Sequence, residues 1–170
     1  QSYFPTYIKV VNNTINGGGI AGTNGINMGH PGKPVTNTII SNNTIKNWLG
    51  ANGIRCNSGS NNITISANIV TGLTRAASAG IGVGDGSHTV TISTNKISNC
   101  VTGIGAGNEV LKILGNTVQG CSSNGISAGV SNGGDVSNNT VRNNGLYGVN
   151  LDANSLNCIV DANQVFDDAD

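Results

Sequence analysis

Apolar and polar positions follow a short pattern that recurs along the whole chain. The pattern [IV]-x-x-N-x-[IV] occurs seven times, with its asparagine at Asn13, Asn43, Asn68, Asn95, Asn116, Asn139 and Asn163. The Ile, Val and Asn frequencies alone would produce about one occurrence if positions were independent. Successive asparagines are 30, 25, 27, 21, 23 and 24 residues apart. The pattern is therefore an internal repeat whose units accept loops of different length.

A second element lies between every two successive asparagines of the repeat. It consists of Gly, then Ile or Val, a variable residue and an apolar residue, and it begins at Gly25, Gly53, Gly80, Gly103, Gly125 and Gly148. Both elements have period two, which is typical of a β-strand, and neither is long enough for a helical period. Five positions of each unit are expected to face a common interior. In the fourth unit they are Val90, Ile92, Ile97, Ile104 and Ala106.

The repeated asparagine also has a predicted mechanism. Asn tolerates a left-handed backbone conformation, so we expect it to form the corner between two strands. Copies in adjacent units, about 4.8 Å apart, can then hydrogen-bond amide to amide as a ladder. The Gly that opens the second element is expected to supply another tight corner.

The segments "VVNNTI", "ISNNTI", "ISTNKI" and "ILGNTV", each followed later by "GI", resemble the parallel β-helix repeats of the pectate-lyase-like superfamily. The resemblance covers nearly the whole chain. It implies an all-β fold, a single-stranded right-handed parallel β-helix (solenoid) of about seven coils. We expect one domain, 1–170, that is part of a longer chain or an assembly. Members of this superfamily mostly act on or bind extracellular polysaccharide, which predicts an extracellular location or one at a cell or virion surface.

Composition narrows the possible partners. The chain has 26 Gly and 28 Asn, only 9% charged residues and a formal net charge of zero. A nucleic-acid partner is not expected, because such binding depends on clustered Lys and Arg. Apolar runs are only a few residues long, which argues against membrane insertion. The remaining partners to consider are a polysaccharide and further copies of the chain, joined as a homo-oligomer or end to end.

Candidate carbohydrate-binding residues come from the sheet that follows the repeated Gly. Its outward and terminal positions include Asn27, Arg55, Asn57, Ser127, Asn150 and Asp152, whose side chains can hydrogen-bond sugar hydroxyls. Hydrolysis of a glycosidic bond needs two carboxyl groups about 5 to 9.5 Å apart. Asp85 and Asp152 share one loop position but are three units apart, roughly 14 Å at strand spacing. We therefore predict no catalytic residues.

Other chemistry receives less support from the sequence. A polysaccharide lyase or epimerase would need a base and a cation, which Arg55 could provide with groups of the insertions 29–36 and 71–79. These groups are His30, Lys33 and Arg75, with His88 nearby. No metal site and no cofactor are predicted, since Gly84-Asp85-Gly86 occurs once and the Cys spacing fits no metal. Cys56 and Cys158 take inward positions, and Cys100 and Cys121 should stack as buried thiols rather than a disulfide.

Three functions remain open at this point. The leading prediction is a non-catalytic extracellular scaffold, such as a surface protein, fibre or tailspike-type stalk, that binds polysaccharide. The first alternative is a lyase or epimerase acting on an acidic glycan. The second is a self-assembling structural fibre, because strand edges at the ends of a β-helix invite association unless they are covered.

Overall fold

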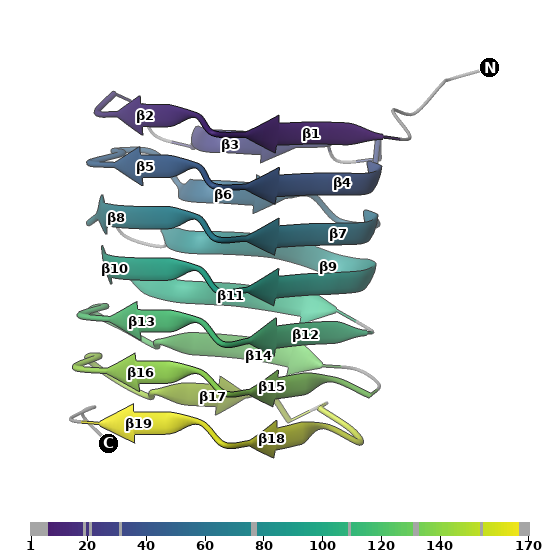
Figure 1. The fold of residues 1–170 in the computed structure, drawn as a ribbon, viewed down its shortest axis with the longest axis vertical. Coiled ribbons are helices and arrows are strands. Elements are labelled where there is room, and N and C mark those ends of the chain that lie inside the picture. Colours follow the sequence, from purple (N-terminus) through teal and green to yellow (C-terminus); the bar gives the residue numbers. More distant parts are fainter. Residues whose placement is uncertain are drawn as a thin grey trace.

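The repeat units of the sequence fold into stacked coils, as the computed structural model shows (Figure 1). The structure describes residues 7–18, 20, 22–30, 32–75, 78–108, 110–130, 133–153 and 155–166. Each complete coil contains one strand before the repeated Asn, one after it and one after the Gly. Strands of successive coils pair in parallel and in register, for example Ile97 with Val70 and Val118.

The strands before the repeated Asn form the first sheet. They are β1 (Ile8–Val11), β4 (Thr36–Ser41), β7 (Asn61–Ser66), the end of β9 (Ala79–Ser93), β12 (Leu111–Leu114), β15 (Asp135–Ser137) and β18 (Ile159–Asp161). The strands after the Asn form the second sheet. They are β2 (Thr14–Asn16), β5 (Thr44–Lys46), β8 (Ile69–Leu73), β10 (Lys96–Cys100), β13 (Thr117–Gln119), β16 (Thr140–Arg142) and β19 (Gln164–Phe166).

The strands after the Gly form the third sheet. They are β3 (Asn24–Met28), β6 (Asn52–Cys56), the start of β9, β11 (Thr102–Asn108), β14 (Ile126–Val130) and β17 (Val149–Leu151). β9 runs around a corner and joins the first and third sheets. The described chain thus completes six turns and begins a seventh, so its number of turns is slightly below the seven coils predicted.

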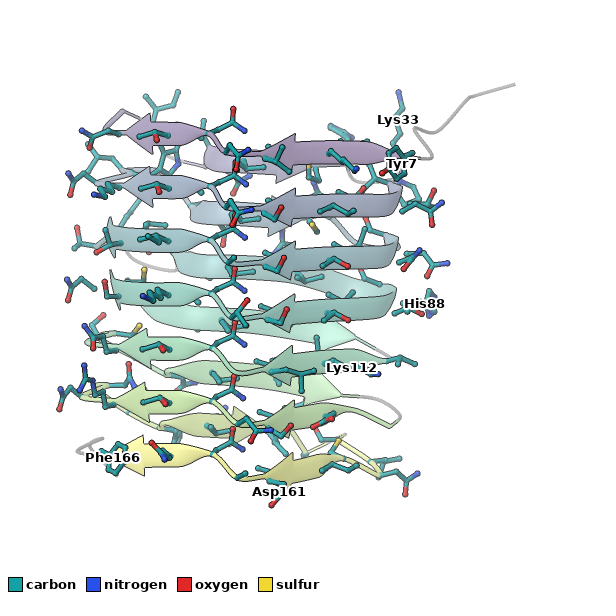
Figure 2. All side chains as sticks on the ribbon, in the orientation of Figure 1. Tyr7, Lys33, His88, Lys112, Asp161 and Phe166 are labelled. Carbon is teal, nitrogen blue, oxygen red and sulfur yellow. The ribbon has the colours of Figure 1, made fainter. Side chains whose placement is uncertain are left out.

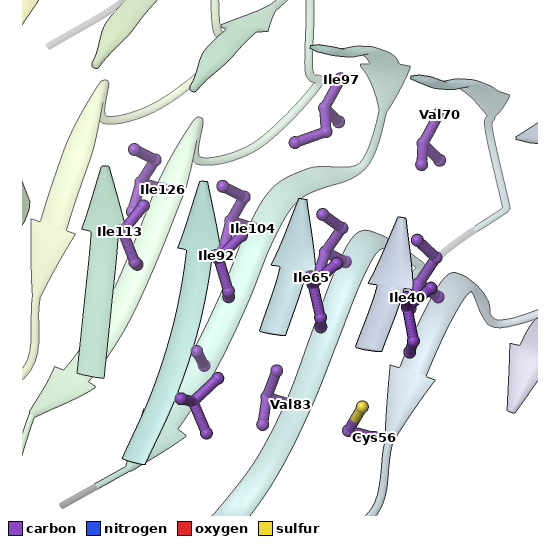
Figure 3. Close-up of a cluster of buried hydrophobic side chains, with 14 of the residues drawn as sticks. Ile40, Cys56, Ile65, Val70, Val83, Ile92, Ile97, Ile104, Ile113 and Ile126 are labelled. Carbon is purple, nitrogen blue, oxygen red and sulfur yellow. The ribbon is translucent and has the colours of Figure 1, made fainter. Parts of the chain in front are cut away.

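The core is a set of apolar columns that run along the stack. In the fourth coil all five residues predicted to face inward are buried, from Val90 to Ala106. Figure 3 shows one row in which Ile40, Ile65, Ile92 and Ile113 follow one another through successive coils. Burial of one such side chain contributes about 1.5–3 kcal/mol before entropy is deducted. Because every coil covers the next, this stabilisation is shared along the whole stack.

The asparagine ladder is confirmed from Asn13 to Asn163. Each side-chain Nδ2 donates to the Oδ1 of the next asparagine over 2.9–3.0 Å. Asn95 illustrates the complete pattern, because its Nδ2 also donates to the Ile65 carbonyl and its Oδ1 also accepts the Asn68 backbone N–H. All the donors and acceptors of this buried amide are therefore used.

The structure corrects the predicted backbone roles of Asn and Gly. The positive φ belongs to the residue before each ladder asparagine: Asn12, Asn42, Ala67, Thr94, Gly115, Asn138 and Ala162. This preceding residue turns the chain, and the ladder asparagine then points inward. Gly103 has no positive φ; instead, a Cβ there would collide with Val118 Cγ1 and the Gly125 carbonyl oxygen. The repeated Gly thus permits close approach of two sheets and does not form a left-handed corner.

The residues at the two ends of the stack are only partly described. Tyr7 and Phe166 are exposed at opposite ends, as Figure 2 shows. The aromatic residues Tyr3 and Phe4 and the acidic tail 167–170 lie outside the described residues. The described part of the chain has no helix with the length and apolar character needed to cross a bilayer.

Candidate carbohydrate-binding groove

A shallow groove of about 430 Å³ runs along the outer face of the third sheet. It extends from β6 in the second coil to Asp152 in the sixth, which corresponds to roughly 19 Å along the stack at strand spacing. Its floor contains Gly82, Gly105, Gly107 and Gly129. These outward positions carry no side chain, whereas Arg55 and Ser127 stand at equivalent positions on either side. The groove is therefore a gap in the outer row of side chains.

Asn52 and Arg55 form the N-terminal end of the groove. Asn52 Oδ1 lies 2.8 Å and Arg55 Nη1 3.2 Å from the point that a Cβ of Gly82 would occupy, so both side chains lean over this glycine. Asn52 is held in place because its Nδ2 donates to Asn24 Oδ1 over 2.7 Å and its Oδ1 accepts the Ala79 N–H over 3.3 Å. Arg55 is half-buried, and its side chain makes no hydrogen bond or ion pair with any other described residue. Its guanidinium is available to a ligand.

Asp85 and Asp152 form the C-terminal end of the groove. The carboxyl carbon of Asp85 lies 3.3 Å from the point that a Cβ of Gly107 would occupy, and that of Asp152 lies 3.2 Å from the same point at Gly129. Gly107 and Gly129 are direct partners in neighbouring strands. Asp85 leans toward the C-terminal end of the stack and Asp152 toward the N-terminal end. Both exposed carboxylates therefore approach the same part of the floor.

A β-bulge directs Asp85 toward this position. Ala106 pairs with Val83, but Asn108 pairs with Ser87, so the segment 84–86 lies opposite the single residue Gly107. Extra residues of this kind bend a strand and re-aim its side chains. Gly86 has a φ of +69°, which allows the reversal after Asp85. At the other carboxylate, the Ser155 hydroxyl donates to Asp152 Oδ1 over 3.3 Å.

The expected separation of these two carboxyl groups needs correction. Counting coils predicted roughly 14 Å between Asp85 and Asp152. However, each carboxyl carbon lies within 3.3 Å of a Cβ point, and the two Cβ points are on adjacent strands about 4.8 Å apart. The carboxyl carbons are thus at most about 11 Å apart. The distance of roughly 14 Å holds for the strands, and the two side chains shorten it because they lean toward each other.

The six predicted binding residues divide into two groups. Arg55, Ser127 and Asp152 line the groove. Asn57 Nδ2 instead donates to Asn27 Oδ1 over 3.2 Å and to the Gly29 carbonyl over 2.9 Å, so the Asn27–Asn57 pair ties the first two coils together. Asn150 is the strand partner of Ser127 and lies outside the groove lining. Which of these residues contact a glycan stays a prediction.

Among the residues that the sequence suggested for a lyase, Arg55 lines the groove and the others do not. His30 and Lys33 face each other in a tight turn, where each backbone N–H donates to the other's carbonyl. Lys33 and His88 lie at the side of the stack (Figure 2). The Ser78 backbone N–H donates to the Arg75 carbonyl in a second turn. Pro31 and positions 76–77 of the two insertions lie outside the described residues.

The cysteines are not part of the groove. All four are free thiols, with Cys56, Cys100 and Cys121 buried and Cys158 half-buried. Burial raises the pKa of Cys56 and that of Cys100 to about 12, so these thiols stay protonated at neutral pH. No three His, Cys, Asp or Glu side chains among the described residues are close enough to hold a metal ion.

Comparison with known proteins agrees with this architecture. The family model described as "Right handed beta helix region" matches residues 3–165. The chain therefore belongs to the right-handed β-helix family. No curated protein and no solved structure matches it.

Sequence reasoning missed several groove residues, although signals for them were present. Asn52 and Thr102 occupy an outward column, one position before the repeated Gly, and are not among the predicted binding residues. Asp85 was recognised as an acid but not as a groove residue. Two signals could have identified the site: glycines at outward positions in two successive coils, and the Gly84-Asp85-Gly86 insertion that makes the bulge.

Proposed function

We propose that this chain is an extracellular β-helix scaffold that binds a polysaccharide segment along the groove of the third sheet. One observation carries the proposal: a side-chain-free floor, open along the stack axis, has a guanidinium, amides and carboxylates at its rim. Glycine and alanine on the floor leave room for the flat faces of several linked sugar rings. The rim supplies both donors and acceptors, which sugar hydroxyls need.

The elongated shape supports a polymeric ligand rather than a compact one. Groove residues come from five successive coils, and the groove is a shallow surface depression rather than an enclosed cavity. A linear glycan can enter such a depression at any point along its length. A location outside the cell or on a cell or virion surface forms part of this proposal, because free polysaccharide chains are found there.

Glycan panels can test the proposal with a variant that fills the groove. A Cβ at Gly105 would lie 3.9 and 4.0 Å from its nearest atoms, which are ordinary contacts. Gly105→Trp can therefore place its ring over the floor without a clash at the Cβ. The matched control is Thr91→Trp, which adds the same ring to the outer face of the first sheet in the same coil. We expect Gly105→Trp to weaken glycan binding at least tenfold in affinity electrophoresis, and Thr91→Trp to leave it unchanged. Absence of any glycan ligand, or full binding by Gly105→Trp with an unchanged melting temperature, would reject the proposal.

A further inference from the structure

The two ends of the stack differ in charge. Five of the eight Lys and Arg residues precede Asp85 in the sequence, whereas none of the eight Asp and Glu residues does. The chain before Asp85 thus has a formal charge of +5, and the remainder has −5. Lys33 lies close to the first coil and Asp161 lies in the last one, at opposite ends of the stack (Figure 2). The net charge of zero therefore combines a cationic first half with an anionic second half.

The asparagine ladder leaves complementary groups at its two ends. Inside the ladder each Oδ1 accepts two hydrogens, as Asn116 Oδ1 does from the backbone N–H and the Nδ2 of Asn95. Asn13 Oδ1 has no such donor among the described residues. Asn163 Nδ2 donates to the Val136 carbonyl, and within the described chain neither its second hydrogen nor the Asn163 backbone N–H has an acceptor. One end of the ladder thus has a free acceptor and the other has two free donors.

The inward apolar columns are also open at both ends. Val136 and Val141 in the sixth coil are fully buried, whereas their strand partners in the seventh coil, Val160 and Val165, are 50% and 46% exposed. In the first coil Ile15 is only partly buried. Among the described strands, β18 and β19 pair on one edge only, and so do β1 and β2. Each end therefore exposes the kind of surface that coils bury against one another inside the stack.

We propose that copies of this chain stack head to tail, so that the seventh coil of one copy lies on the first coil of the next and the rod continues across the contact. The register inside the stack then pairs Val160 with Val10 of the next copy, and Val165 with Ile15. β18 would pair with β1 and β19 with β2, as further parallel strands. Burial of the open apolar columns is the main source of stability at this contact.

The ladder and the charges both favour contact between unlike ends. Asn163 of one copy would donate its backbone N–H and its second Nδ2 hydrogen to Asn13 Oδ1 of the next copy, as Asn139 donates to Asn163. Contact between two like ends would place donors against donors, or acceptors against acceptors, and would bring equal charges together. The groove residues belong to the second to sixth coils, so this inference is independent of the proposed function.

The proposed contact is small and does not close on itself. Among the described residues, the seventh coil has strands of the first and second sheets only, so four short strands form the contact. A contact of this size should be weak. Because each copy joins through two different surfaces, a filament always keeps a free first coil at one end and a free seventh coil at the other. The assembly should therefore lengthen as the protein concentration rises.

Sedimentation velocity tests the inference over protein concentrations from about 1 μM to about 1 mM, which covers the dissociation constants expected for a weak contact. We expect the average mass of the wild-type protein to rise with concentration. Val165→Lys adds a charge that the contact would bury, and it should raise the concentration needed for association about tenfold or more. The matched control, Ile69→Lys, adds the same charge at an exposed side chain of β8, away from both ends, and should associate like the wild type.

A mixture of two variants tests whether the contact is head to tail. Ile15→Lys alters the first coil and leaves the seventh coil free, whereas Val165→Lys alters the seventh and leaves the first free. Each variant alone should stay monomeric at concentrations where the wild-type protein associates, and their equimolar mixture should form a dimer and nothing larger. A melting temperature close to that of the wild type verifies that each variant is folded. The comparison of Val165→Lys with Ile69→Lys tests the inference without Ile15→Lys.

A wild-type protein that stays monomeric over the whole concentration range would overturn the inference, and so would association of Val165→Lys at wild-type concentrations. Wild-type assembly that stops at a dimer would indicate contact between like ends and would overturn the head-to-tail arrangement. Absence of a dimer in the mixture of two folded variants would overturn it as well. Glycan binding is measured separately with Gly105→Trp, so failure of the proposed function does not change these outcomes.

Discussion

The asparagine ladder and the groove are built from the same coils but treat polar groups in opposite ways. Asn95 is fully buried, and both its amide hydrogens and its oxygen have partners in neighbouring coils. Arg55 is half-buried and Asp85 is exposed, and neither side chain has a hydrogen-bond partner within the described chain. Polar groups that stabilise the fold are thus bonded internally, whereas these two groove side chains, to which the proposed function assigns binding, are not. Stability and binding should therefore respond to different substitutions.

The largest effect is expected for Asn95→Ala. This substitution leaves the Asn68 side chain and backbone N–H and the Ile65 carbonyl without their buried partner. Each unsatisfied buried group costs about 1–3 kcal/mol, so the free energy of unfolding should fall by about 3–5 kcal/mol. Urea denaturation measures this change. Asn61→Ala, an exposed control in the first sheet, should stay within about 0.5 kcal/mol of wild type. Equal effects of the two variants would contradict the stabilising role of the ladder.

A pair of glycines in β11 gives a second and smaller contrast. A Cβ at Gly103 would collide with Val118 and with the Gly125 carbonyl, so Gly103→Ala should destabilise the protein by about 2–3 kcal/mol. Gly105 lies two residues along on the outer side, where a Cβ has ordinary contacts at 3.9 and 4.0 Å. Gly105→Ala should leave the melting temperature unchanged or raise it slightly, because it restricts the unfolded chain. A stable Gly103→Ala protein would show that the sheets can separate at low cost.

The smallest effect concerns the buried thiols at alkaline pH. Burial raises the pKa of Cys56 from 9.0 to about 12, so above pH 9 the unfolded chain loses this proton while the folded chain keeps it. Stability is therefore fully present below pH 9 and declines as the pH rises toward 12, by about 1 kcal/mol for this thiol at pH 10. Cys56→Val should remove that part of the decline in denaturation curves recorded at pH 8 and pH 10. An unchanged pH dependence would mean that Cys56 is accessible to solvent in the folded protein.

The fold could be predicted from the sequence because the residues that face the core recur periodically. The inward positions of each coil recur relative to one asparagine, and Ile92, Ile97 and Ile104 are buried as expected. The backbone conformation between the strands of a coil was harder to predict. Thr94, a β-branched residue, has a φ of +54°, a conformation that it rarely adopts and that recurs before every ladder asparagine. Local preferences at this position do not reveal a conformation that is fixed by contacts between coils.

The groove was only partly predictable, because it depends on where side chains are missing. Pattern analysis located the outer face and three of its residues, Arg55, Ser127 and Asp152. It assigned no role to Gly82 and Gly105, which lie on the groove floor. It also placed Asp85 by coil number, although a bulge against Gly107 decides where the carboxylate lies. Such a bulge arises from an insertion relative to the neighbouring coil, and a search for regular repeats ignores insertions.

The direction of the ladder has a consequence for how proteins of this kind change in evolution. The bond from Asn68 to Asn95 is equivalent to that from Asn95 to Asn116, so a duplicated or deleted unit would rejoin matching partners. The rod can therefore grow or shrink by one step of about 4.8 Å without new contacts. A change between positions 55 and 152 would shift Arg55 relative to Asp152 along the groove while the scaffold stayed intact. Gain or loss of a single unit would thus change the length and the charge spacing of the groove in one step.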